Sequence, residues 1–292
     1  LRSLPVLPNF TMNVAALEQA IVADRAAGLE PCCVIGNAGS VNTGAIDDLQ
    51  ALADLCERED LWLHVDGAFG ALAAMSETLR PLVQGMERAD SLAFDLHKWL
   101  YMPYDVGCVL VRDSAAHRRS FGARASYLAP LERGAAAGAY DFSALGPELS
   151  REFRALKVWM LLKEHGADKY ARLIEQNVAQ AKYLAGKVHR HGELELMAPV
   201  PLNIVCLRYL GTAGRPDPSR LDALNRELLM RIQERGIAVP SSTSLNGRFA
   251  IRVAISNHRS VRNDFDVLVD AVVTIGRELS LGSETGAAPQ AG

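Results

Sequence analysis

Short apolar runs that alternate with helical patterns constrain the fold of this chain more than any other feature. The alternation predicts an α/β fold in which a mostly parallel sheet is buried between helices. Expected strands are 31–35, 61–65, 91–94 and 106–111, and expected helices are 14–28 and 46–58. The strand at 106–111 is expected to run in reverse, because 98–105 is shorter than the roughly dozen residues that a parallel crossover needs.

Two of these runs lead to polar groups that suit one cofactor. The run 61–65 is followed by Asp66, and the run 91–94 is followed by Asp95, His97 and Lys98. Ligands of open α/β sheets bind beyond the carboxyl ends of the strands, so the acid and the amine are expected to face one site. Pyridoxal 5'-phosphate (PLP) requires such a pair, a lysine for the Schiff base and an acid that keeps the pyridine nitrogen protonated.

These residues also resemble a known family, the PLP-dependent group II amino acid decarboxylases. The resemblance extends over about 1–279 and is closest to the aromatic-L-amino-acid branch, especially its bacterial members. The matching segments are His64–Ala68, Asp95–Trp99, Phe153–Trp159 and Phe249–Ile255. The resemblance implies the fold-type I PLP-dependent transferase fold. It further implies that this chain corresponds to the C-terminal two thirds of such an enzyme, without the part that normally supplies phosphate-binding residues and a histidine stacked on the cofactor.

The expected organisation follows the resemblance and the composition. A partial large PLP-binding domain is expected at 1–150, connecting helices at 151–190, a small C-terminal α+β domain at 191–279 and a disordered tail at 280–292. The Gly- and Ala-rich segment 113–147 predicts a long connection or mobile loop. Further helices are expected at 149–165, 168–189, 218–235 and 261–279, and further strands at 202–209 and 248–255.

The resemblance assigns roles at the two strand ends. Lys98 would carry the cofactor as a Schiff base, Asp66 would pair with the pyridine nitrogen, and Ala68 would pack against one face of the ring. His97 and Asp95 would lie by the phosphate. The side-chain role of Asp95 is open, because an acid is unfavourable there and several animal enzymes have Asn-Pro-His-Lys instead. Without the resemblance, Lys98 reads as a surface lysine and Asp66 as the cap of a turn.

Other candidates have simpler alternatives beside the functional one. Ser40 either belongs to an ordinary turn or places its hydroxyl beside Asp66 or the lysine. Arg252 forms a salt bridge or contacts the substrate carboxylate. Tyr127 matches the mobile-loop tyrosine thought to act as proton donor, and relatives with Phe there tend toward aldehyde synthesis.

Two further groups are expected to support the fold. His64 points to the same face of its strand as Asp66, where it braces the carboxylate or fills an interface. Arg151, Arg154 and Lys157 recur at helical spacing and indicate a solvated or interdomain face.

Composition excludes several function classes. The net charge of −3 argues against non-specific nucleic-acid binding. No apolar run approaches the roughly 20 residues that span a bilayer. The first residues do not have the pattern of a signal peptide, and no metal site is expected. The five cysteines lack a Cys-x-x-Cys pair and predict buried, reduced thiols and a cytoplasmic location. They are Cys32, Cys33, Cys56, Cys108 and Cys206.

The resulting hypothesis is a homodimeric PLP-dependent carboxy-lyase that converts an L-amino acid, aromatic by resemblance, to its amine. Alternatives are a PLP-dependent aldehyde synthase, another PLP lyase or an aminotransferase. A catalytically silent fragment is the alternative from a different class.

Overall fold

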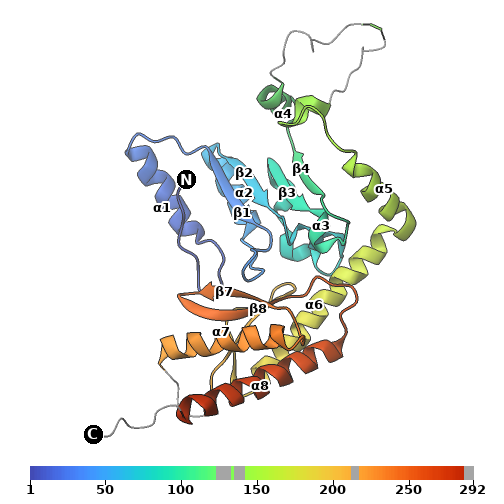
Figure 1. The fold of residues 1–292 in the computed structure, drawn as a ribbon. Helices are drawn as coiled ribbons and strands as arrows, with labels where there is room; N and C mark the ends of the chain where they lie inside the picture. Colours follow the sequence, from blue (N-terminus) through green and yellow to red (C-terminus); the bar gives the residue numbers. More distant parts are fainter. Residues whose placement is uncertain (123–132, 135–141, 212–216, 286–292) are drawn as a thin grey trace.

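The first half of the chain builds a four-stranded sheet (Figure 1). The computed structural model describes residues 1–122, 133–134, 142–211 and 217–285. The strands are β1 (Cys33–Asn37), β2 (Trp62–Asp66), β3 (Ser91–Asp95) and β4 (Gly107–Val111), in the order β1-β2-β3-β4. β1, β2 and β3 are parallel, and β4 runs antiparallel to β3, which confirms the expected reversal.

Only one face of this sheet is well covered by the described residues. Val34 and Leu63 are buried on the face that packs against α2 (Leu49–Glu59). On the other face Ile35 is 47% exposed and Val109 is 52% exposed. Asp66 belongs to this open face, because side chains alternate along a strand.

Short helical elements connect the strands of the first sheet. α2 starts later than expected because Asp48 caps it, accepting the Ala51 N–H at 3.0 Å, while Asp47 accepts the N–H groups of Met12 and Asn37. The other elements are α1 (Val14–Ala26), η1 (Ala71–Met75), η2 (Arg80–Val83), η3 (Met86–Arg88), α3 (Leu96–Trp99), α4 (Ser114–Phe121) and η5 (Phe142–Leu145).

The second half builds an antiparallel sheet with helices on its outer side. The strands are β5 (Leu194–Leu196), β6 (Ile204–Tyr209), β7 (Ser241–Leu245) and β8 (Arg248–Ala254), in the order β5-β6-β8-β7. α7 (Pro218–Glu234) and α8 (Arg262–Thr285) lie on the side of this sheet away from the first sheet (Figure 1). The fold is therefore α/β with a mostly parallel sheet and a smaller antiparallel one, as expected.

One long helix is shared between the two hydrophobic cores. α5 (Arg154–His165) leads into α6 (Ala167–Arg190). α6 contributes Ile174 to the core of the first sheet and Leu184 to the core of the second, and both side chains are fully buried.

Several boundary expectations were wrong. α5 begins at Arg154 rather than 149, so Arg151 precedes the helix. The expected connection 113–147 contains α4, whose N-terminus is capped by Asp113 through the N–H groups of Ala115 and Ala116. α8 continues to Thr285, into the stretch expected to be tail.

The cysteines are all free, but they are not all buried. Cys56 and Cys206 are buried, whereas Cys32 and Cys33 are exposed, contrary to expectation. Cys33 lies on the edge strand β1 and faces away from α2, which explains its exposure. None of the described helices is long and apolar enough to cross a membrane.

Candidate active site

Asp66 lies at the carboxyl end of β2, and Lys98 lies just beyond the carboxyl end of the neighbouring β3. Asp66 is the last residue of β2 and pairs in register with Ala93 of β3. Asp95 ends β3 on the same face, two residues past Ala93, which is about 7 Å along a strand. Lys98 follows in the one-turn helix α3 rather than in the strand. The two strands therefore deliver an acid and an amine to one edge of the open face.

The two charged groups have different partners. Asp66 is exposed, and its Oδ1 accepts the backbone N–H of Ala68 at 3.0 Å. The ammonium of Lys98 forms an ion pair with Asp95, with 2.7 Å between Nζ and Oδ2. Asp95, whose role the sequence left open, is thus the counter-ion of Lys98.

Glycines let the turns after β1 and β2 pack backbone against backbone. A Cβ on Gly67 would lie 2.5 Å from Ala71 Cβ, and one on Gly70 would lie 2.5 Å from the Ala38 carbonyl oxygen. Gly39 has a φ of 86° and approaches the same Gly70 backbone. The rim beside Asp66 therefore has little side-chain bulk.

His97 is fixed by its neighbours. Its Nδ1 accepts the backbone N–H of Val106 at 3.0 Å, and its ring centroid lies 4.3 Å from that of Tyr104. Because Nδ1 accepts, the neutral imidazole carries its proton on Nε2. Nε2 is the nitrogen that remains to donate to a ligand.

Ser40 and Arg252 come together at the turn after β1, although they are far apart in sequence. Ser40 Oγ lies 3.1 Å from Thr43 Oγ1. Arg252, on β8, donates from Nε to the Val41 carbonyl at 2.8 Å and from Nη1 to Ser241 Oγ at 3.1 Å. Burial lowers the pKa of the Arg252 guanidinium, while the nearby Cys206 acts in the opposite direction. Arg252 therefore binds backbone and hydroxyl oxygens, and no carboxylate within the described part of the chain forms a salt bridge with it.

His64 does not reach toward Asp66. Its Nδ1 lies 2.8 Å from Ser91 Oγ, which also accepts the indole N–H of Trp62 at 2.7 Å. This bond supports the interface-filling alternative.

The basic residues near α5 are surface groups. Arg154 pairs with Asp105 at 3.1 Å, and Lys157 donates to the Tyr104 carbonyl at 3.1 Å. Arg151 pairs with Glu148 at 3.5 Å. Tyr127 lies outside the described residues.

A buried polar residue that the sequence reasoning missed lies next to the lysine turn. Asn177 of α6 is fully buried and accepts the indole N–H of Trp99 at 3.1 Å. The signal was an asparagine within the apolar stripe of a helix, since Asn177 lies at helical spacing between Ile174 and Ala181.

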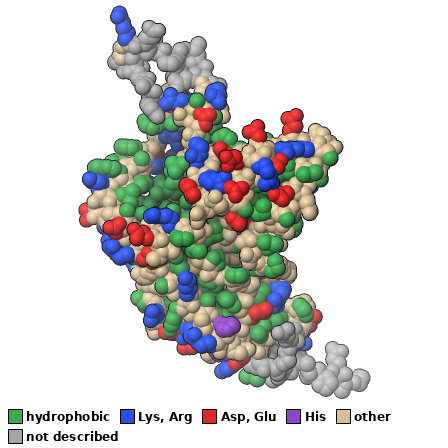
Figure 2. Space-filling model, turned by 180° about the vertical axis from the view of Figure 1, so that it is seen from behind, with side chains coloured by type: hydrophobic (Ala, Val, Ile, Leu, Met, Phe, Trp, Pro, Cys, Tyr) green, Lys and Arg blue, Asp and Glu red, His purple; other side chains and the backbone are tan. Residues whose placement is uncertain are grey.

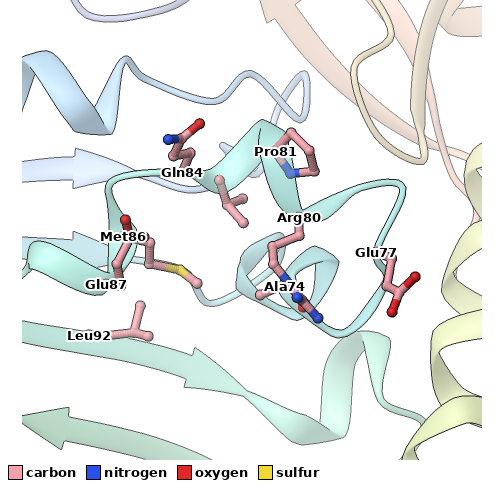
Figure 3. Close-up of a pocket in the computed structure, with 9 residues that line it drawn as sticks. Ala74, Glu77, Arg80, Pro81, Gln84, Met86, Glu87 and Leu92 are labelled. Carbon is pink, nitrogen blue, oxygen red and sulfur yellow. The ribbon is translucent and has the colours of Figure 1, made fainter.

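The cavity in Figure 3 is separate from this site. It has a volume of about 480 Å³, and its lining includes Arg80, Pro81, Met86 and Leu92. Leu92 lies between Ser91 and Ala93 on β3, so its side chain faces away from the open face that carries Asp66.

Charged and hydrophobic side chains are unevenly distributed over the molecular surface (Figure 2). Basic and acidic side chains mix on the side that carries α1, where Arg58 pairs with Glu18 at 2.7 Å. Hydrophobic side chains gather on the opposite side, which carries α5. On α5, Trp159 is 61% exposed and Met160 is 56% exposed.

Comparisons with known proteins agree on one family. The family model described as "Pyridoxal-dependent decarboxylase conserved domain" matches residues 1–210. The aromatic-L-amino-acid decarboxylase of Bacillus atrophaeus is 37% identical over 273 residues, which cover 94% of this chain and 56% of that protein. Tyrosine decarboxylase 4 of Petroselinum crispum is 32% identical, with 91% of this chain and 55% of that protein covered. The chain thus spans about half the length of these relatives.

Solved structures give the same result. Oryza sativa TDC with PLP and tryptamine superposes with a TM-score of 0.89 at 29% identity, covering 96% of this chain and 58% of that one. The 4-hydroxyphenylacetaldehyde synthase of Rhodiola rosea superposes with a TM-score of 0.84 at 26% identity, covering 96% and 57%.

Proposed function

The chain belongs to the pyridoxal-dependent decarboxylase family, and we propose that it is the lysine-bearing part of a PLP-dependent amino acid decarboxylase. The observation that carries the proposal is the placement of Asp66 and Lys98 at one edge of the open sheet face. The substrate class we propose is aromatic L-amino acids, by analogy with the Bacillus atrophaeus relative.

The amine and the carboxylate at this edge fit the chemistry of the cofactor. An aldehyde needs an amine, and Lys98 supplies one; a protonated pyridine nitrogen needs a carboxylate, and Asp66 supplies one. The exposed Asp66 carboxylate is accessible to a ring nitrogen, and the neighbouring Ala68 adds only a methyl group beside it. These features support PLP rather than a metal as the group that this edge would hold.

The bound cofactor would supply an electron sink for the negative charge left when carbon dioxide departs. Lys98 would hold it covalently through Nζ and must lose a proton to act as a nucleophile. Asp95, 2.7 Å away, is a base placed to take that proton. Asp66 would keep the pyridine nitrogen charged, and the free Nε2 of His97 would donate to the phosphate. The Ser40 hydroxyl would lie beside Asp66 or the lysine.

The substrate would be oriented from the second half of the chain. Arg252 reaches the turn that carries Ser40 and Val41, and its guanidinium lacks a carboxylate partner among the described residues. We propose that it lies near the substrate carboxylate. Tyr127 is proposed as the proton donor that yields an amine. An aldehyde product would instead favour the synthase alternative, and the chain is similar in fold to the 4-hydroxyphenylacetaldehyde synthase of Rhodiola rosea.

We also propose a homodimer in the cytoplasm. The exposed apolar side chains of α5 offer a surface for a second copy, and the free cysteines fit a reducing compartment. Sedimentation of the chain tests the dimer, and a monomer at all concentrations would contradict it.

Borohydride reduction in the presence of PLP tests the proposed function. We expect peptide mapping to find the reduced cofactor on Lys98, because Lys98 is the lysine at the strand ends. Lys98→Met should abolish this label, whereas Asp66→Asn should retain it, since the carboxylate is not needed for the covalent bond. Labelling of another lysine in place of Lys98 would reject the assignment.

A further inference from the structure

We propose that Asn177 is a positioning residue that fixes the orientation of Lys98. The inference rests on the proposed function for its purpose, but its geometry is independent of the cofactor. Lys98 lies in α3, a helix of four residues. One helical turn has few internal hydrogen bonds and does not hold its own conformation in water. The orientation of Lys98 must therefore come from contacts outside α3.

Asn177 binds the residues that follow Lys98. Trp99 is fully buried and donates its indole N–H to Asn177 Oδ1 at 3.1 Å. The hydroxyl of Tyr101 donates to the same oxygen. Two donors from one short segment therefore converge on one buried acceptor of α6.

The amide nitrogen of Asn177 fixes this acceptor in turn. Its Nδ2 donates to Gln180 Oε1 at 3.1 Å and to the Asn257 carbonyl at 3.3 Å. The side chain thus accepts two hydrogen bonds and donates two, which is the full capacity of an amide. A rotated amide would leave buried groups unpaired, so its orientation is strongly specified.

Trp99 also connects the lysine turn to the turn after Asp66. Its ring stacks on Phe69, with 5.7 Å between the centroids and 9° between the planes. Phe69 follows Ala68 in the turn after β2. Fixing Trp99 therefore fixes Lys98 relative to Asp66, which is the relation that a cofactor bound to both residues requires.

Asn177→Ala tests the proposal, with Asn225→Ala as a matched control. Asn225 is equally buried on a helix, and its Nδ2 donates to Tyr209 O and Leu221 O at 2.9 Å, within the second core. Both substitutions remove a satisfied buried amide, and both should lower the melting temperature. Only Asn177→Ala should loosen α3.

Amide hydrogen exchange measures that loosening without any cofactor. We expect exchange in 96–102 to be about tenfold faster in Asn177→Ala, as for a segment that opens locally. The same segment should stay within about twofold of wild type in Asn225→Ala. Trp99→Phe, which keeps the stack and removes the donor, provides the test if Asn177→Ala does not fold.

Labelling with PLP and borohydride then separates the two proposals. Lys163, an exposed lysine on α5, serves as the reference for background labelling. If wild-type Lys98 is labelled, the label on Lys98 relative to that on Lys163 should fall about tenfold in Asn177→Ala, on the scale of a misplaced reacting group. Failure to label wild-type Lys98 would reject the proposed function and leave the exchange result standing. Equal effects of Asn177→Ala and Asn225→Ala on exchange in 96–102 would overturn the positioning role.

Discussion

Asp66 and Lys98 differ in whether their charged groups already have a partner of opposite charge among the described residues. Lys98 is paired with Asp95, whereas the exposed Asp66 carboxylate accepts a single backbone N–H at 3.0 Å among the described residues. The carboxylate is therefore available to a cationic ligand at the edge of the sheet. This availability makes Asp66 the more informative residue for a test of turnover.

We expect Asp66→Asn to lower turnover of the PLP-loaded enzyme by at least about a hundredfold, the scale of a lost electrostatic contact. A neutral amide does not stabilise a protonated pyridine nitrogen as a carboxylate does, and each tenfold in rate is about 1.4 kcal/mol of barrier. Steady-state kinetics measure the change. Turnover close to that of wild type would mean that Asp66 only caps its turn.

The raised pKa of the Tyr101 phenol predicts that the folding free energy of the protein falls at alkaline pH. Burial raises the pKa of its phenol from 10.0 to about 12. The folded state then retains this proton where the unfolded state has lost it, so the stabilisation is present below pH 10 and is lost as the pH rises toward 12. Tyr101→Phe should lose less folding free energy than wild type between these pH values, measured by urea unfolding. Parallel losses in the two proteins would contradict the prediction.

At the level of elements, the sequence predicted the parts whose apolar period is strong. β2 and β3 lie close to their expected positions because each is a short apolar run, and α6 and α7 do so because their apolar residues recur at helical spacing. α5 began late because Leu149 and Phe153 are apolar but exposed, so apolar spacing overstated the helix.

Two strands were missed for different reasons. β5 has only three residues, too few for a periodic signal. β7 reads Ser-Ser-Thr-Ser-Leu and has little apolar alternation, so its pairing with β8 makes it a strand. The two-residue turn Asn246-Gly247, with φ values of 52° and 75°, was the signal that predicts this hairpin.

The turn after β2 has its observed packing because Gly67 has no side chain. Gly67→Ala would place a Cβ 2.5 Å from Ala71 Cβ, so the turn must shift. Overpacking of this kind costs about 1–3 kcal/mol of folding free energy. Gly192→Ala is the matched control, because a Cβ there meets nothing within 4 Å. Urea unfolding measures both variants, and equal stability of the two would show that the turn has room for a methyl group.

On the scale of the whole molecule, α6 makes the two halves depend on each other. It contributes Ile174 and Val178 to the first core and Leu184 and Val188 to the second. Asn177 adds a polar link from α6 to Trp99 and to the Asn257 carbonyl. Apolar spacing predicted this helix, but a sequence does not reveal that one helical stripe serves two separate cores, because the stripe is continuous.

This sharing predicts that the chain unfolds as one unit. Trp62 and Trp99 lie in the first sheet unit, and Trp159 lies on α5, whose Val158 and Leu162 pack against the first core. Tryptophan fluorescence therefore reports on the first core and its surroundings. Leu184→Ala removes a fully buried side chain from the second core and should cost about 2–5 kcal/mol. If α6 couples the cores, the tryptophan transition in urea should shift as far as the far-ultraviolet dichroism transition does. Ile174→Ala, in the first core, should shift both transitions together as well. A tryptophan transition that Leu184→Ala leaves in place would mean that the halves unfold separately and that α6 frays between them.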